Sequence, residues 1–317
     1  MANYCLNSIA SNLRLNGYAI IEDAVSNANV SEILSYTESL VTRVNANDLG
    51  SSFMGNTQYY TNIIANSKVV YDAIVSSLVL DLCTEVFGNG FTLVNNRIQT
   101  TRGSSSMLWH TDNNLLEDGR LVGRHDMPGL QFVLYLTDVS ASPFQLIQNS
   151  HRWSLGYKEQ YLLDDDIKKL NLEIVEIIPP PGSLLVLNTH LFHRAAPIIG
   201  KANVRSLLLF QVDKISNRYP HHGEKVFLNP EFLAAANPEI FSYLGFGRKR
   251  AYPPFPESSL VNLDLSHLLS LQARLLRALP RALVLKYLKR AIPSSLLLIT
   301  QLAPRRADWA HRLVRIY

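Results

Sequence analysis

The stretch Trp109-His110-Thr111-Asp112 decides the expected fold and chemistry of this chain. Side chains alternate faces along an extended segment, so a histidine and a carboxylate one residue apart point the same way. A second histidine, His193, can join them from a neighbouring strand. Two histidines and one carboxylate on one side of a metal are typical of non-haem Fe(II) sites, in which the remaining coordination positions stay open for co-substrate and dioxygen. The sequence therefore predicts His110, Asp112 and His193 as catalytic iron ligands.

An arginine follows the second histidine at an informative distance. Arg205 lies twelve residues after His193 and opens a predicted strand, Ser206–Val212. A guanidinium binds a carboxylate through two parallel hydrogen bonds, a task for which lysine is a poorer substitute. Beside an iron site, this arginine favours a dicarboxylate co-substrate. These residues predict an Fe(II)- and 2-oxoglutarate-dependent oxygenase in which Arg205 anchors 2-oxoglutarate and dioxygen binds the remaining metal position.

Two apolar segments are expected to carry these groups. Gln131–Thr137 is rich in β-favouring residues and predicts a strand. A Pro-Gly-Ser turn leads into a second predicted strand, Leu184–Asn188, which runs toward His193. The order of strand, ligand, loop, anchor and strand can bring His193 and Arg205 into one pocket. Gln131, at the start of the first strand, is a candidate contact for the co-substrate.

A third predicted strand, Phe91–Thr101, carries polar side chains. Asn95, Arg97 and Gln99 share one of its faces. If that face looks into a barrel, Gln99 is a candidate contact for 2-oxoglutarate and Arg97 for substrate or co-substrate. The plainer interpretation, a sheet face turned to solvent, is favoured by this pattern alone.

From about Leu13 to about Val212 the chain resembles the phytanoyl-CoA dioxygenase-like family of 2-oxoglutarate oxygenases. Several motifs in family order carry the resemblance: Leu15-Asn16-Gly17-Tyr18-Ala19-Ile20-Ile21, the pair His110 and Asp112, Asp138-Val139-Ser140, Asn149-Ser150-His151-Arg152-Trp153, Pro181-Gly182-Ser183, His193 and Arg205. Asn149 stands where the family usually has glycine.

The resemblance implies a mainly β fold with flanking helices, namely a double-stranded β-helix (jelly roll, cupin-like) core and a C-terminal helical appendage. It implies that His110, Asp112 and His193 bind Fe(II) and that Arg205 pairs with the distal carboxylate of 2-oxoglutarate. His190 is an alternative distal ligand, but the family order of turn and strand favours His193. Dioxygen is the expected second co-substrate, and ascorbate an expected stimulant.

Composition sets the class of protein. With 317 residues, 47% of them hydrophobic and 18% charged, the chain is expected to be folded. Cys5 and Cys83 are too few for a disulfide framework and fit a reducing compartment. The N-terminal segment lacks the pattern of a signal peptide, and no apolar run is long enough to span a bilayer. A cytoplasmic location is expected.

The charges divide unevenly along the chain. Residues 1–264 hold 20 Lys and Arg against 25 Asp and Glu, a net of −5, whereas residues 265–317 hold 10 against one, a net of +9. We therefore predict an oxygenase domain over 1–263 and a basic, leucine-rich helical tail over 264–317. Basic amphipathic helices of this kind favour contact with an anionic membrane surface, here the inner face of the cytoplasmic membrane. Packing on the core or on a second subunit is the alternative, and no nucleic-acid partner is expected.

Several functions remain open at this point. Hydroxylation of a C–H bond is favoured, because related halogenases replace the carboxylate that Asp112 supplies; desaturation or ring formation is the alternative. The tail favours an anionic, lipid-linked glycan as substrate, such as the Kdo sugar of lipopolysaccharide. A soluble natural product, amino acid or acyl-CoA is the runner-up. Two alternatives come from other functional classes. A zinc hydrolase lacks support because the chain has no His-Glu-x-x-His motif. A non-catalytic membrane scaffold would not need the three metal-ligand residues.

Local patterns predict further elements. Helices are expected over 8–16 (with Ser8 as a possible cap), 31–44, 67–87, 157–170 and 228–243, and loops over 45–56 and 113–129. The 113–129 loop carries Arg120, Arg124 and His125 and is either a lid or a surface insertion. The acidic run in 157–170 and the pair His221-His222 are expected at the surface, and His151 is expected to brace structure.

Overall fold

The computed structural model describes residues 4–41, 51–54, 57–103, 107–112, 116–117, 120–121, 127–153, 161–197, 204–215, 226–234 and 236–246. Among these residues no helix is long and apolar enough to cross a membrane. The predicted tail 264–317, the pair His221-His222, and Arg124 with His125 lie outside the described residues.

The helices are α1 (Leu6–Asn16), α2 (Asn27–Val41), α3 (Lys68–Ile74), α4 (Ser77–Phe87), α5 (Asp164–Lys169), α6 (Pro230–Leu233) and α7 (Pro238–Tyr243), with the 3-10 turns η1 (Ile63–Ala65) and η2 (Ser150–Arg152). The strands are β1 (Tyr18–Ile21), β2 (Ser51–Met54), β3 (Thr57–Thr61), β4 (Phe91–Arg102), β5 (Trp109–His110), β6 (Leu116–Glu117), β7 (Arg120–Leu121), β8 (Gly129–Tyr135), β9 (Phe144–Ile147), β10 (Tyr161–Leu162), β11 (Ile174–Ile177), β12 (Leu184–Asn188), β13 (His193–Ala195) and β14 (Val204–Lys214).

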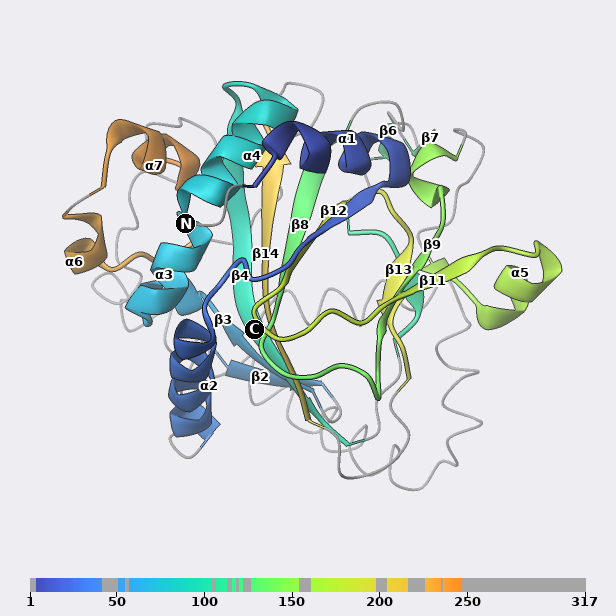
Figure 1. Ribbon diagram of the computed structural model, residues 1–317, viewed down its shortest axis with the longest axis horizontal. Coiled ribbons are helices and arrows are strands. Elements are labelled where there is room, and N and C mark those ends of the chain that lie inside the picture. Colours follow the sequence, from blue (N-terminus) through green and yellow to red (C-terminus); the bar gives the residue numbers. More distant parts are fainter. Residues whose placement is uncertain are drawn as a thin grey trace, which may run out of the picture. The chain divides into compact units, whose positions relative to one another are not determined.

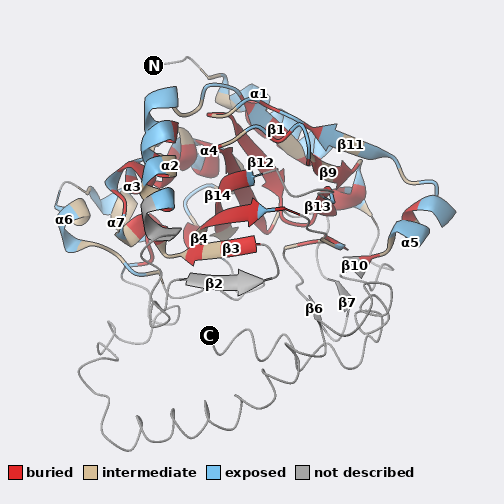
Figure 2. Ribbon diagram, turned by 90° about the horizontal axis from the view of Figure 1, so that it is seen from below, coloured by how far each residue is buried: buried red, intermediate tan, exposed pale blue. Residues whose placement is uncertain are grey.

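Two antiparallel sheets form the core. The larger has seven strands in the order β1-β12-β8-β14-β4-β3-β2, and the smaller has five in the order β10-β5-β13-β9-β11. Neighbouring strands come from distant parts of the chain, as in a jelly roll, and the predicted double-stranded β-helix is confirmed (Figure 1). Burial follows this plan, because most strands of both sheets are buried while β11 and much of α5 are exposed (Figure 2).

Each face of the seven-stranded sheet has its own apolar cluster. One face packs under the helices, where Leu134 and Phe210 join Leu13, Ile74 and Leu82 in one buried cluster. The other face meets the five-stranded sheet. There the buried cluster combines side chains of both sheets: Val133, Tyr135, Leu185, Leu187, Leu207 and Leu209 from the larger, and Phe144, Leu146 and Ile177 from the smaller. Polar groups on this second face therefore look into the barrel.

The helix predictions need corrections at their ends. α1 begins at Leu6 after Cys5, and Ser8 donates its backbone N–H within the first turn instead of capping the helix. The expected helix over 67–87 is two helices, because the chain breaks at Val75 and Ser76 before α4 starts. Ser67 caps α3 by accepting a hydrogen bond from the backbone N–H of Val70.

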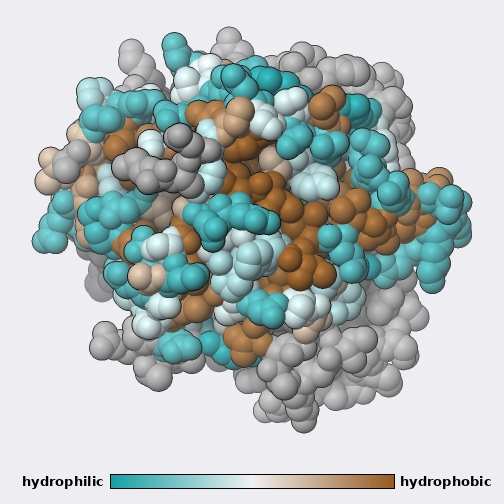
Figure 3. Space-filling model, in the orientation of Figure 1, coloured by the Kyte–Doolittle hydropathy of each residue, from teal (hydrophilic) through white to brown (hydrophobic). Residues whose placement is uncertain are grey.

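Three other segments differ from the prediction. The expected loop over 45–56 contains strand β2, which is paired with β3 and whose sequence, Ser-Ser-Phe-Met, gives no alternating pattern. The 113–129 segment contains the short paired strands β6 and β7. The expected helix over 157–170 is only α5, preceded by β10, and the expected helix over 228–243 divides into α6 and α7. The outer surface of α5 is hydrophilic, as its acidic run predicted (Figure 3).

Candidate metal centre

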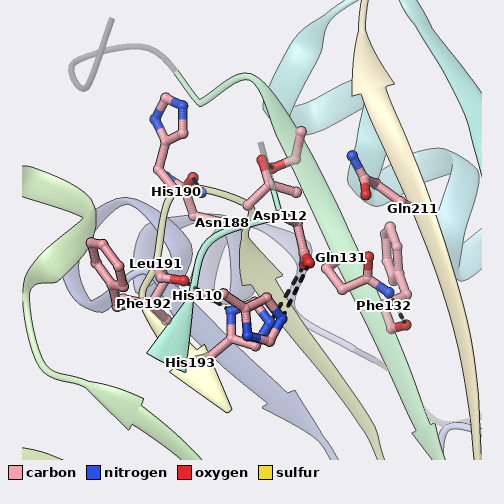
Figure 4. A network of polar contacts seen from close by, with 12 residues as sticks. His110, Asp112, Gln131, Phe132, Asn188, His190, Leu191, Phe192, His193 and Gln211 are labelled. Atoms are coloured by element: carbon pink, nitrogen blue, oxygen red, sulfur yellow. Dashed lines mark hydrogen bonds and ion pairs between the residues drawn. The ribbon is translucent and has the colours of Figure 1, made fainter. Parts of the chain in front are cut away.

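Two short strands bring the predicted ligands together. β5 and β13 are antiparallel neighbours in which His110 and His193 are direct partners, so both rings project to the same face. Asp112 follows β5, and its backbone N–H donates to the carbonyl of Thr189 at 3.1 Å. One ligand atom from each of His110, Asp112 and His193 lies within 4.8 Å of the other two. Figure 4 shows the three side chains converging.

Backbone contacts fix the tautomer of both histidines. Nδ1 of His110 lies 2.9 Å from the carbonyl oxygen of Leu108, and Nδ1 of His193 lies 2.9 Å from that of Leu191. A carbonyl only accepts, so each Nδ1 carries the proton and each Nε2 keeps its lone pair for a metal. The Nε2 atoms lie 3.8 and 3.5 Å from the Asp112 carboxylate oxygens. The rings also lie 4.5 Å apart at their centroids.

The electrostatics suit a cation. Burial, followed by the proximity of His193, lowers the pKa of His110 to about 4, so this ring stays neutral at physiological pH. The positive charge of Arg97 acts in the same direction. Oδ2 of Asp112 is shielded from solvent and accepts no hydrogen bond from any residue that the structure describes. Two imidazoles with their Nε2 atoms turned inward and a carboxylate oxygen without a hydrogen-bond donor fit a divalent metal such as Fe(II).

A polar cluster on the opposite face of β5 and β13 holds the ligand strands together. Arg194 stacks over the indole of Trp109, with Cζ 4.3 Å from the ring centroid. Oδ1 of Asp164 in α5 accepts from Nη1 of Arg194 at 2.7 Å and from Nε1 of Trp109 at 3.1 Å. Nε of Arg194 donates to Oε1 of Gln145 in β9 at 2.8 Å. We call Trp109, Arg194 and Asp164 the outer clamp.

The turn before His193 is equally constrained. Oδ1 of Asn188 accepts from the backbone N–H of His190 at 3.0 Å. Oγ of Ser150 accepts from the backbone N–H of Phe192 at 2.9 Å. His190 is absent from the cluster of metal-ligating groups found among the described residues, and its ring points away from that cluster (Figure 4). The geometry therefore favours His193 over His190 as the distal ligand.

The loop that supplies Ser150 is built as the sequence indicated. Asn149 has φ 60°, a left-handed conformation that glycine and asparagine adopt most readily, which explains asparagine at a family glycine position. His151 is buried against Gly17, where an added Cβ would lie 2.5 Å from Nδ1 of the ring. Arg152 donates to the carbonyl of Arg14 at 3.0 Å. The loop thus braces the end of α1 rather than binding metal.

Arg205 lies on the inward face of β14 and is 4% exposed. Its Nη1 donates to Oγ of Ser142 at 2.5 Å, while its Nε has no hydrogen-bond partner in the described part of the chain. Burial lowers the pKa of this guanidinium, and the nearby Tyr135 and Tyr59 oppose that effect. A buried cation with an unused donor needs an anion, so the arrangement can hold a carboxylate.

Gln99 and Gln131, the other predicted contacts of 2-oxoglutarate, lie on the same inward face of the larger sheet as Arg205. In the sheet register Gln99 lies opposite Leu207 and Gln131 lies opposite Gln211, on the side that meets the smaller sheet. Gln99 and Gln131 are both buried. The favoured interpretation of this strand face as solvated is corrected, because Gln99 is buried and Asn95 and Arg97 are half-buried on the side that meets the smaller sheet.

Sequence reasoning missed several residues around the site. Ser142, which holds Arg205, lies in a segment with no distinctive pattern. The strand pattern of Gln131–Thr137 does not indicate that Tyr135 lies near Arg205. Asp164 was expected to be a solvated charge without a role, yet it completes the outer clamp. The sequence gives one indication of the outer clamp, because Trp109 immediately precedes His110 and Arg194 immediately follows His193.

Comparison with known proteins agrees with this geometry. The sequence profile of the family described as Phytanoyl-CoA dioxygenase (PhyH) matches residues 13–206, more than half of the chain. No curated protein sequence matches it.

Solved structures share the fold at low identity. HygX from Streptomyces hygroscopicus, with nickel and 2-oxoglutarate bound, is 20% identical with a TM-score of 0.53, covering 67% of this chain and 88% of its own. The epimerase SnoN, in complex with Fe3+, alpha ketoglutarate and nogalamycin RO, is 13% identical with a TM-score of 0.52, covering 66% and 83%. The carbocyclase SnoK from nogalamycin biosynthesis is 13% identical with a TM-score of 0.53, covering 68% and 87%.

Proposed function

The chain belongs to the phytanoyl-CoA dioxygenase family and is an Fe(II)- and 2-oxoglutarate-dependent enzyme, and we propose that it hydroxylates a C–H bond of a small molecule. The observation that carries the proposal is the convergence of His110, Asp112 and His193, whose ligand atoms lie within 4.8 Å of one another. The two Nδ1 contacts with backbone carbonyls add weight, since they leave both Nε2 atoms available to a metal.

Each residue has a proposed role. Nε2 of His110, Nε2 of His193 and an oxygen of Asp112 would hold Fe(II). Arg205 would pair with the distal carboxylate of 2-oxoglutarate, supported by the bond that its Nη1 makes with Ser142. When bound, iron and 2-oxoglutarate supply the oxidising power, using dioxygen.

The protein supplies order and a dry environment around that chemistry. The apolar cluster between the sheets, with Val133, Tyr135 and Leu207 among its members, excludes water from the inward ends of the site. Gln99 and Gln131 are proposed to contact 2-oxoglutarate because both are buried on the inward face. Their amides can donate to a carboxylate and still accept from a neighbour.

Hydroxylation is proposed ahead of halogenation because Asp112 supplies the carboxylate that related halogenases replace. The names of SnoN and SnoK, an epimerase and a carbocyclase, show that proteins of this fold carry out other reactions. We therefore expect the substrate's position, and not the ligand set, to choose between hydroxylation, desaturation and ring formation.

A more specific proposal concerns the substrate. HygX has been solved with hygromycin B and SnoN with nogalamycin RO, so relatives of this fold bind soluble natural products. We keep an anionic lipid-linked glycan, such as the Kdo sugar of lipopolysaccharide, as the specific proposal, with a soluble natural product, amino acid or acyl-CoA as the alternative. Its support is the +9 charge of residues 265–317. This proposal places the enzyme in the cytoplasm at the inner face of the membrane.

Uncoupled turnover tests the function without knowledge of the substrate. Metal-free protein is supplied with Fe(II), 2-oxoglutarate and dioxygen, and succinate is measured. We expect succinate that depends on Fe(II) and disappears when Zn(II) replaces it. Ester or amide hydrolysis with Zn(II) and no 2-oxoglutarate would instead support a zinc hydrolase, and no turnover with either metal would support a non-catalytic scaffold.

A further inference from the structure

A second arginine, Arg97, lies on the same face of the seven-stranded sheet as Arg205. In the register of β4 and β14, Arg97 is opposite Leu209 and Thr101 is opposite Arg205. Directly opposed residues point to one face, and every second residue shares it. Leu209 belongs to the buried cluster that includes Phe144 of the other sheet. Both guanidinium side chains therefore enter the space between the sheets.

The charge of Arg97 is not neutralised within the described part of the chain, where it makes no ion pair. Its Cζ lies 5.7 Å from the ring centroid of Tyr59, a contact that positions a cation without cancelling its charge. Its Nε is shielded from solvent and has no hydrogen-bond partner among the described residues. A buried donor on a charged group costs free energy until an acceptor reaches it, so this side chain is suited to an anion brought by a ligand.

Arg97 also lies close to the candidate metal ligands. One residue pair away along the sheet, Asn95, Gln211 and Gln131 form a row across three strands. Nδ2 of Asn95 donates to Oε1 of Gln211 at 3.4 Å. The charge of Arg97 also acts on His110, one of the candidate metal ligands, and lowers its pKa. A ligand held by Arg97 would therefore be near the metal.

The charge balance of the loaded site indicates which kind of ligand. The negative charge of Asp112 and the two of 2-oxoglutarate are matched by Fe(II) and Arg205. Arg97 then contributes one positive charge in excess. Arg97 is half-buried and its Nε is shielded from solvent, so a neutral substrate that covered this side chain would leave its charge uncompensated, which is unfavourable. One carboxylate would cancel it.

We propose that Arg97 is a specificity-determining residue that binds a carboxylate of the substrate, so that the part of the substrate that enters the site carries a single negative charge. This inference rests on the proposed function, because it assigns the substrate class of the same site. A phosphate monoester would bring a second negative charge for which the described residues offer no partner. A sugar acid such as Kdo meets the requirement, as does a carboxylated natural product.

Acetate tests the proposal because it is small enough for any pocket that admits a larger carboxylate. Full-length protein is loaded with Ni(II) and saturating 2-oxoglutarate, and paramagnetic relaxation of the acetate methyl protons is measured by NMR. Acetamide serves as the neutral probe of equal size, methyl phosphate as the phosphate probe, and Zn(II)-loaded protein as the diamagnetic blank. We expect enhanced relaxation for acetate above that for acetamide and methyl phosphate.

The variants separate Arg97 from other sources of binding. Arg97→Gln should weaken acetate binding at least about tenfold, the loss expected for one charge-assisted pair, whereas Arg97→Lys should retain part of it. Arg102→Gln, on the exposed end of the same strand, is the matched control and should bind acetate like the unaltered protein. Binding of Ni(II) and 2-oxoglutarate is measured in the same samples and should be unchanged.

Failure of the proposed function and failure of the Arg97 inference give different results. If Ni(II) and 2-oxoglutarate fail to bind the unaltered protein, the proposed function itself fails. If both bind, but acetate relaxes no faster than acetamide or binds Arg97→Gln and Arg102→Gln equally, this inference alone is overturned. Tighter binding of methyl phosphate than of acetate would also overturn it, since the ligand would then be a phosphate.

Discussion

Oδ1 of Asp164 accepts a hydrogen bond from Nη1 of Arg194 at 2.7 Å, and the same oxygen accepts from Trp109 at 3.1 Å. Arg194 follows His193 in the sequence and Trp109 precedes His110. One carboxylate on α5 thus joins the two strands that carry the candidate histidine ligands, from the face opposite the metal centre.

Removing the Asp164 carboxylate should lower metal affinity more than it lowers the free energy of unfolding. The Asp164 side chain is 60% exposed, so Asp164→Asn should reduce unfolding free energy by less than about 1 kcal/mol. Metal affinity should fall by roughly tenfold, the lower end of what outer-shell contacts contribute. Asp165→Asn, exposed on the same helix, is the control. Equal metal affinity in both variants, measured by competition with a chelator, would contradict a positioning role.

The pKa of His110 predicts how the metal-free protein responds to acid. Its folded pKa is about 4 against an ordinary value of 6.5. Between these values the unfolded chain binds a proton that the folded chain does not, so unfolding free energy falls as pH falls from 6.5 to 4. The full effect is on the order of 3 kcal/mol.

Urea unfolding of the metal-free protein across this pH range provides the measurement. His151 acts in the same direction because burial lowers its pKa, so His110→Gln should reduce the pH dependence without removing it. An unaltered slope in His110→Gln would show that the ring is not desolvated as the structure indicates.

Arg205 should govern the requirement for 2-oxoglutarate. Arg205→Gln removes a charge-assisted pair worth about 1.5–3 kcal/mol, so the 2-oxoglutarate concentration for half-maximal succinate formation should rise by roughly 10- to 100-fold. Arg102→Gln should leave it unchanged. Metal affinity without 2-oxoglutarate should be equal in both variants, and a loss of metal in Arg205→Gln would mean that this arginine supports the ligands instead.

The basic tail should decide the location of the enzyme. Each basic residue near an anionic surface contributes about 1 kcal/mol, so full-length protein should sediment with vesicles of anionic phospholipid at low salt and be released at high salt. A truncation ending near Asp264 should remain in the supernatant in both conditions. If full-length protein also stays there, the membrane proposal fails and the Kdo proposal loses the support of the tail.

The parts of the structure that could be predicted are those with local patterns. The alternation in Trp109-His110-Thr111-Asp112 and the apolar run Leu184–Asn188 indicated strands, and the latter was predicted with the bounds observed. β2 and β3 were not predicted because their pairing in the sheet, β2 with β3 and β3 with β4, and not their own sequence, makes them strands. The face of Arg97 and Gln99 was misjudged for a similar reason, since only the second sheet buries it.

Contacts across long sequence separations were beyond prediction. Asp164 meets Arg194 thirty residues away, and Ser142 meets Arg205 after sixty-three. Nothing in either segment marks these partners, because a hydroxyl in a turn or a carboxylate in the first turn of a helix is common. The family order already favoured His193 over His190, and the turn gives the physical reason, because it directs one ring to the cluster and the other away (Figure 4).

The central claim, that His110, Asp112 and His193 hold iron while 2-oxoglutarate binds beside it, is tested most directly by anaerobic titration with Fe(II) and 2-oxoglutarate. The visible charge-transfer absorption of the iron–2-oxoglutarate complex reports both ligands at once. We predict one equivalent of Fe(II) bound with this absorption in the unaltered protein and in His190→Ala, and no absorption in His110→Ala, Asp112→Ala or His193→Ala. Absorption that persists in His193→Ala and vanishes in His190→Ala would contradict the account.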